Sequence, residues 1–361
     1  MLATQDPTHM SALIARLEAE LAGQALIDTP MHPDCEAVVV IPVRAERVER
    51  LTRLLKSVAM QDIDLRRVEV MMVINNRPPE ESQEWHDAYS LNQALLGRPW
   101  GIPGLAIHTV DQSSHGLWVP GSNVGMARQR GLAEAALRFA SIGRNGLVFQ
   151  TDADCWLDDP SFLFKLLWLF SQNPALTALG GHYTLELDVQ DPEAEGIFEL
   201  LPSYKQHQRY LELYRDVTRG TVGRTEPLNT LGRCIVSRAF ESIEAGGVPP
   251  IPHYEDFEFC MQFEKAGMEM AWGHKLGIGL MSAFRLSERT PSSIRSELER
   301  VARDGGVLLV DDAFNPGHKI ELDEMYIGRL ADAVREMENG EARLGYIFFQ
   351  HPIMRLRIVG L

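Results

Sequence analysis

Unbroken apolar runs alternate with amphipathic stretches along the chain from residue 37 onward. Ala37 to Val43, AVVVIPV, is a continuous apolar run, which is typical of a strand buried on both faces. Further strands are expected at 68–74, 105–110 and 147–149, and helices with one apolar side at 44–58, 80–96 and 124–140. This alternation predicts an α/β fold, a Rossmann-like and mostly parallel sheet with helices on both faces.

The same reading extends to both ends of the chain. It predicts helices at 161–172, 237–244 and 255–267, and strands at 178–187, 231–236 and 268–272. Helical periodicity also marks 11–25, 294–301 and 320–337, and an apolar tail with two arginines closes the sequence. We therefore expect an N-terminal helical extension and linker (1–36), a core domain (37–285) and a C-terminal helical extension with the tail (286–361).

Two carboxylates follow the strand at 147–149 directly. Asp152 and Asp154 are two residues apart, which places both side chains on one face of an extended chain. Clustered carboxylate oxygens suit hard divalent cations such as Mg²⁺ or Mn²⁺, and the end of a strand is where ligands bind in open α/β sheets. The alternative is a loop in which the aspartates cap or solvate turns. The pattern alone leaves both open.

Composition narrows the class of protein. The formal net charge of −15 over 361 residues argues against nucleic acid as a partner. The four cysteines show neither metal spacing nor a CxxC pair, so we expect reduced thiols and a cytoplasmic protein. Neither a signal peptide nor an apolar run of membrane-spanning length is present, so the chain is expected to be soluble.

The apolar tail contains Tyr346, Phe348 and Phe349, interleaved further on with Arg355 and Arg357. Such a composition suits docking onto the core domain or onto a second copy of the chain in a homodimer. The alternative is a peripheral contact with a membrane surface. We favour docking, because two basic residues are too few for firm attraction to anionic lipid.

Four stretches together carry a resemblance to a known family. They are VVVIPVRAE at the first strand, NVGMARQRG before the acidic pair, FQTDAD itself, and SRAFESIEAGGV with YEDFEFCMQFEKAG beyond it. In this order they resemble family 2 glycosyltransferases of the GT-A fold, over about two thirds of the chain. The resemblance implies transfer of a sugar from a nucleotide-diphosphate sugar, UDP- or GDP-linked, to a hydroxyl acceptor, with Mn²⁺ or Mg²⁺ as cofactor.

The resemblance also implies roles for single residues. Pro42, Arg44 and Glu46 would line the pocket for the base and ribose, and Asn75 stands where many members have Asp. Arg128 would lie under the diphosphate, because guanidinium groups match phosphate oxygens. Arg130, two residues on, is expected on a solvated helix face.

The remaining roles concern the metal, the acceptor and the proton. Asp154 would bind the metal, Asp152 the metal, ribose or donor sugar, and His274 matches a position where some members place a further metal ligand. Leu231-Gly232-Arg233 stands where members often show Gly-x-Asn, so contacts with the donor sugar or acceptor through Gly232 would differ. Asp256 is the expected general base and Glu255 its less favoured alternative, although Asp256 could also be a helix N-cap.

These features predict an inverting, metal-dependent hexosyltransferase. Three alternatives remain open: retaining transfer on the same fold, a nucleotidyltransferase, and a catalytically silent protein that binds sugar nucleotides. A nucleotidyltransferase usually has a glycine-rich loop after the first strand, which VVVIPVRAERVER lacks. The silent protein is disfavoured by the presence of Asp152, Asp154 and Asp256 together.

Overall fold

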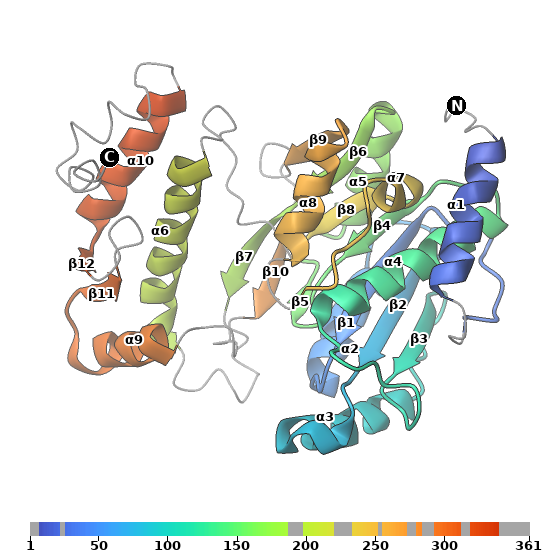
Figure 1. The fold of residues 1–361 in the computed structure, drawn as a ribbon, viewed down its shortest axis with the longest axis horizontal. Helices are drawn as coiled ribbons and strands as arrows, with labels where there is room; N and C mark the ends of the chain where they lie inside the picture. The colour runs from blue at the N-terminus through green and yellow to red at the C-terminus, as the bar shows by residue number, and fades with distance from the viewer. Residues whose placement is uncertain are drawn as a thin grey trace. The chain divides into compact units, whose positions relative to one another are not determined.

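The computed structural model describes residues 7–21, 26–186, 198–219, 233–251, 255–272, 279–283, 292–311 and 318–338. The chain divides into two compact units (Figure 1). The first unit comprises Met1–Thr184 with Thr230–Ser282, and the second comprises Leu185–Asn229 with Ala283–Leu361. The expected accessory helix, α1 (Pro7–Glu20), belongs to the first unit. The expected boundaries at residues 37 and 285 stay a prediction.

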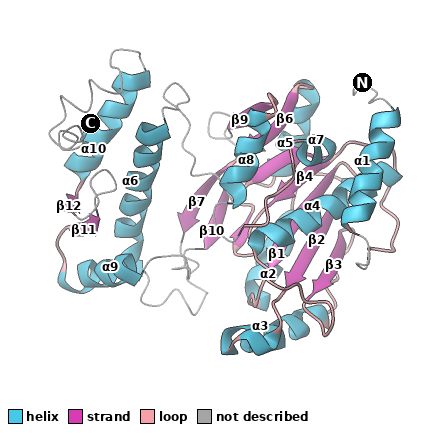
Figure 2. Cartoon of the chain, viewed as in Figure 1, coloured by secondary structure: helices cyan, strands magenta, loops and turns pink. Residues whose placement is uncertain are grey.

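A seven-stranded sheet forms the centre of the first unit (Figure 2). Its strands are β1 (Ala37–Val43), β2 (Val68–Asn75), β3 (Ala106–Gln112), β4 (Leu147–Gln150), β6 (Leu176–Gly180), β8 (Ile235–Arg238) and β9 (Glu269–Trp272). They lie in the order β3-β2-β1-β4-β8-β6-β9. All pairings are parallel except the two that β8 makes with β4 and β6. The predicted α/β class with a mostly parallel sheet is confirmed.

Helices cover both faces of this sheet. They are α2 (Val48–Ala59), α3 (Gln83–Leu96), α4 (Val124–Ser141), α5 (Phe162–Gln172), α7 (Ala239–Glu244) and α8 (Glu255–Lys265). Alternate residues of β1, such as Val39 and Ile41, pack with Leu54 of α2 and Phe162 of α5 in one apolar cluster. The opposite face of β1 carries Val40, which lies against α4. The period-two alternation of side chains therefore places one helical layer on each face.

The ends of several elements differ from the prediction. The helix expected from residue 44 begins at Val48, because Ala45 takes a left-handed conformation (φ 51°) that a helix cannot contain. The strand expected at 178–187 is two strands: β6 ends at Gly180, and β7 (His182–Glu186) joins β5 (Cys155–Trp156) and β10 (Gly279–Ala283) in a second sheet. Neither β5 nor β10 was predicted. A strand of two residues such as β5 leaves no periodicity to detect.

The second unit contains more than the helices expected of it. The structure describes α6 (Leu201–Arg219), α9 (Ser292–Asp304), α10 (Glu324–Glu338) and an antiparallel pair, β11 (Leu308–Asp311) with β12 (Lys319–Leu322). Residues 320–322, expected to be helical, therefore lie in a strand. The predicted apolar tail falls outside the described residues. Among the helices that are described, none has the length and apolarity needed to cross a membrane.

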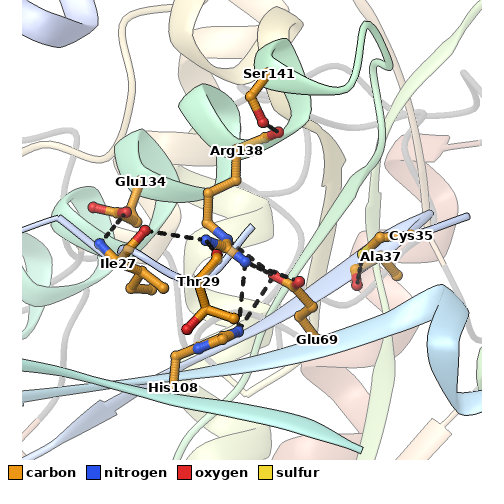
Figure 3. A network of polar contacts seen from close by, with 9 residues as sticks. All are labelled: Ile27, Thr29, Cys35, Ala37, Glu69, His108, Glu134, Arg138 and Ser141. Carbon is orange, nitrogen blue, oxygen red and sulfur yellow. Dashed lines mark hydrogen bonds and ion pairs between the residues drawn. The ribbon is translucent and has the colours of Figure 1, made fainter. Parts of the chain in front are cut away.

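A buried ionic network joins the carboxyl end of α4 to the sheet (Figure 3). Arg138 donates from Nε and Nη2 to the two carboxylate oxygens of Glu69 on β2, both at 2.9 Å, and from Nη1 to the backbone oxygen of Thr29 at 2.8 Å. His108 on β3 lies 3.7 Å from the same carboxylate. Glu134 accepts from the backbone N–H of Ile27 at 3.0 Å. The linker before β1 is thus held by α4.

Candidate active site

The order of the strands places a change of direction between β1 and β4. The chain moves outward from β1 to β2 and β3 and then returns to β4 on the other side of β1, and ligands bind beyond the carboxyl ends of strands at such a point. The backbone N–H of Thr151 donates to the oxygen of Val40 at 3.1 Å. The backbone nitrogen of Pro42, two residues on, points toward the same side of β1, beyond the last residue pair that β1 forms with β4. Its missing N–H therefore costs the sheet no hydrogen bond.

The loops after β1 and β2 are held together by one side chain that was not predicted. Asn92 of α3 accepts from the backbone N–H of Ala45 at 2.7 Å and donates to the backbone oxygen of Asn75 at 3.1 Å. The side chain of Asn75 is buried and donates to Ser122 Oγ at 2.9 Å. Asn92 lies within an ordinary amphipathic helix, so no sequence pattern distinguishes it.

Arg44 and Glu46, both expected to line the nucleotide site, differ in environment. Arg44 is exposed, lies 3.2 Å from Glu84 and stacks over Trp85 with 4.8 Å from its guanidinium carbon to the ring centre. Glu46 is buried and pairs with Arg50 at 3.0 Å. The structure therefore brings Pro42, Arg44 and Asn75 to the same edge of the sheet, whereas the carboxylate of Glu46 contacts α2.

The amino end of α4 lies at this edge. Asn123 caps the helix, because its Oδ1 accepts from the backbone N–H of Met126 at 3.0 Å. A Cβ atom at Gly125 would lie 2.4 Å from the oxygen of Pro249 and 3.1 Å from Cβ of Glu255. Glycine is therefore required for the backbone before α8 to approach so closely. The unpaired N–H groups of a helix start favour a negative charge beside them.

Arg128, in the second turn of α4, is the centre of the site. Its side chain is 1% exposed, and Nη2 donates to Oδ1 of Asp152 at 2.5 Å. Its Nε lies 3.5 Å from Oε1 of Glu255, which is also buried. Burial opposes the charge of the guanidinium, but Asp152, Glu255 and Asp256 outweigh it and raise the pKa of Arg128 above the ordinary arginine value. The permanently charged guanidinium of Arg128 therefore lies beside the carboxyl end of β4.

A second guanidinium lies on the other side of Asp152. Nε of Arg233, which stands just before β8, is 3.8 Å from Oδ2 of Asp152. Burial opposes its charge too, but Tyr183, Asp154 and Asp152 raise the pKa of Arg233 well above the ordinary value. Asp154 itself is 4% exposed, with the Sγ of Cys155 3.8 Å from its Oδ1. Asp152 therefore lies between two arginines, and Asp154 acts on the second of them.

The first turn of α8 supplies two further acidic groups. Glu255 is the first residue of the helix and Asp256 the second, and Asp256 is half-buried. Because Asp256 lies inside the helix, the interpretation of this residue as the N-cap is wrong. Gly232 and His274 lie outside the described residues. Arg130, expected to be solvated, is buried and pairs with Glu134 at 2.7 Å, since α1 packs over this part of α4.

The residues present fit a divalent cation that is shared with a substrate. Within the described ranges, no group of three or more His, Cys, Asp or Glu side chains could hold a metal ion. Magnesium-like ions bound with phosphates need only one or two carboxylates from the protein, and Asp152 and Asp154 offer two. Gln150 and Thr151, directly before them, bury side-chain polar atoms that have no hydrogen-bond partner among the described residues. Buried polar atoms of this kind call for water or a ligand.

Comparison with known proteins gives a resemblance in structure alone. No protein-family model matches the chain, and no curated protein matches it in sequence. The chain resembles several solved structures. A mannosyltransferase, PcManGT from Pyrobaculum calidifontis, in complex with GDP-Man and Mn²⁺, is 14% identical with a TM-score of 0.41, over 82% of this chain and 68% of that one.

TarS of S. aureus is 14% identical with a TM-score of 0.38, over 87% of this chain and 45% of TarS. Its 1–349 fragment is 13% identical with the same TM-score, over 87% of this chain and 75% of the fragment. At such values the likeness fixes neither the reaction nor the substrate. The site has to be interpreted from its own residues.

Proposed function

We propose that this chain is a metal-dependent glycosyltransferase that moves a sugar from a nucleotide-diphosphate donor to a hydroxyl acceptor with inversion. The observation that carries the proposal is the Arg128–Asp152 pair at the carboxyl end of β4, beside the start of α4. Four acidic side chains, Asp152, Asp154, Glu255 and Asp256, surround two guanidinium groups there. This surplus of acidic groups suits a site that also receives a cation.

Departure of the diphosphate requires positive charge beside the leaving oxygens. In our proposal Arg128 and the amino end of α4 supply part of it, and Glu255 keeps the buried guanidinium of Arg128 in place. A divalent cation held by Asp154 and Asp152 would, when bound, neutralise further charge on the leaving diphosphate. Pro42, Arg44 and Asn75 would border the base and ribose at the ends of β1 and β2.

Attack by the acceptor requires a group that takes up a proton. As the bond from the anomeric carbon to the diphosphate breaks, a new bond forms to the acceptor oxygen and its proton passes to Asp256. The half-buried position of Asp256 in the first turn of α8 supports this assignment. We further propose a UDP- or GDP-linked hexose as donor and a cytoplasmic location. The tail would dock onto the core domain or onto a second copy in a homodimer, and any membrane contact would be peripheral.

Calorimetry with UDP or GDP, with and without Mn²⁺, tests the proposal. The expected result is that Mn²⁺ strengthens nucleotide binding by the native chain, and that Asp154→Asn loses this strengthening while it stays folded. Asp159→Asn is the matched control, because Asp159 lies five residues on and pairs with Lys165 at 2.5 Å. Unchanged metal dependence in Asp154→Asn would show that Asp154 is not a ligand.

A further inference from the structure

Arg233 has an environment that a purely structural arginine does not need. Its guanidinium stacks over the ring of Tyr183, 5.0 Å from the ring centre, and Nη1 donates to the Tyr183 hydroxyl at 3.2 Å. The next residue, Cys234, is pressed against the end of β6: a Cβ at Gly181 would lie 2.0 Å from its Sγ. The backbone N–H of Gly181 also donates to the oxygen of Cys234 at 2.8 Å. The start of the Arg233 side chain is therefore firmly placed.

The charged end of the same side chain is only loosely bound. Its Nε is buried and has no hydrogen-bond acceptor among the described residues. The nearest carboxylate oxygen, Oδ2 of Asp152, is 3.8 Å away, which is too long for a hydrogen bond. The side chain is 26% exposed, against 1% for Arg128. The side chain of Arg128 is thus buried in its contact with Asp152, whereas part of the Arg233 side chain remains exposed.

We propose that Arg233 is a ligand of the donor's diphosphate. This inference rests on the proposed function. When the donor binds, the guanidinium of Arg233 exchanges its long contact with Asp152 for non-bridging oxygens of the diphosphate, and Oδ2 of Asp152 becomes available to another cation. Tyr183 keeps the guanidinium plane oriented during the exchange. Planar guanidinium groups bind phosphate oxygens in pairs, which a lysine ammonium cannot do.

Two consequences follow from a guanidinium in this place. The chain should discriminate a nucleoside diphosphate from the monophosphate, because Arg233 contributes only when a second phosphate is present. It should also retain measurable diphosphate binding when divalent metal is removed, since part of the positive charge belongs to the chain. Arg128 and the amino end of α4 would contribute to both properties as well, so the decisive quantity is how much of each property is lost when Arg233 is replaced.

Calorimetry of UDP, GDP, UMP and GMP, each in Mn²⁺ and in EDTA, tests the inference with Arg233→Gln. We expect this variant to bind the diphosphate that the native chain prefers, UDP or GDP, about 10- to 100-fold more weakly, which is the range for hydrogen bonds to charged groups. Its affinity for the monophosphates should change by less than about threefold. Arg67→Gln is the control. Arg67 is similarly exposed (33%) and ion-paired with Glu36, but it lies at the opposite edge of the sheet.

Each outcome decides between the two proposals. Equal losses for diphosphate and monophosphate, or no loss for either, would overturn the role of Arg233 and leave the glycosyltransferase proposal standing. Absence of binding by the native chain to all four nucleotides would overturn both. If Arg233→Gln melts well below the native chain, Arg233→Lys serves instead: it keeps the charge and should still lose discrimination, because the planar fork is gone.

Discussion

Two of the buried arginines of α4, Arg128 and Arg138, stand ten residues apart, and their surroundings differ. Arg138, near its carboxyl end, makes two bonds of 2.9 Å to one carboxylate and another to a backbone oxygen (Figure 3). Arg128, near its amino end, makes one bond of 2.5 Å to Asp152 and a longer contact of 3.5 Å to Glu255. The first network pairs its guanidinium fully with the carboxylate of Glu69, whereas the second gathers more acidic groups than it has arginines.

The helix dipole sharpens this difference. A cation is favoured at the carboxyl end of a helix, where Arg138 stands, and disfavoured at the amino end, where Arg128 stands. Arg138 therefore belongs where it stabilises the fold, and Arg128 adds its charge to an end that is already positive. Arg128 therefore stabilises the fold less than Arg138 does, and the acidic surplus around it leaves room for a cation that an anionic substrate shares. From this comparison we propose that the Arg128 network, in which acidic groups outnumber arginines, is the functional one.

The largest expected effect concerns proton transfer to Asp256, in the Arg128 network. Asp256→Asn should lower turnover at saturating donor by about two to four orders of magnitude, the usual contribution of a positioned base. Donor affinity should hardly change, because the base contacts the acceptor. Steady-state kinetics beside calorimetry measure both quantities.

Glu258→Gln is the control for this loss. Glu258 lies in the same first turn of α8 but is 44% exposed and is 3.8 Å from Lys265, so its variant should keep turnover within about twofold, since an exposed ion pair contributes little. Normal turnover in Asp256→Asn would refute the base assignment and favour Glu255 or retaining transfer.

The next effect concerns the Arg138 network, in which one guanidinium is paired with the carboxylate of Glu69. Arg138→Met should lower the free energy of unfolding by about 3 to 5 kcal/mol, because the buried carboxylate of Glu69 loses its two bonds to the guanidinium and keeps only His108 beside it. The double variant with Glu69→Gln should recover part of that loss, since no uncompensated charge remains. Urea unfolding measures these changes. Nucleotide affinity of the folded fraction should stay unchanged, and a loss of affinity would mean that the two ends of α4 are coupled.

The smallest effect is a pH dependence of stability. Burial raises the pKa of Glu69, but His108 and Arg138 outweigh burial and hold it below the ordinary glutamate value. Ionised Glu69 therefore stabilises the fold above its unfolded pKa, about 4.3, and this contribution disappears as the pH falls through the lower folded-state pKa. In urea unfolding between pH 6 and pH 3.5, Glu69→Gln should lose stability less steeply than the native chain. Equal slopes would show that Glu69 titrates alike in both states.

Much of the fold and part of the site could be predicted from local pattern. The run AVVVIPV and its successors have the periodicity of buried strands, and β1 has the predicted bounds. The acidic pair lies at a strand end as expected, and Arg128 lies beside it. The two-residue strand β5 could not be predicted, nor the division of 178–187 at Gly181, because each depends on a partner distant in sequence.

The sequence by itself determined which residues alternate between faces, where polar groups follow apolar strands, and which chemistry those groups suit. Only the tertiary structure decided which charges meet. Nothing local in the sequence distinguishes Arg128, Arg130 and Arg138, which stand on one helix and are all buried. Their partners come from the loop after β4, from α4 itself and from β2. A charge becomes structural or functional through the number of opposite charges packed around it, and that number is a property of the folded chain.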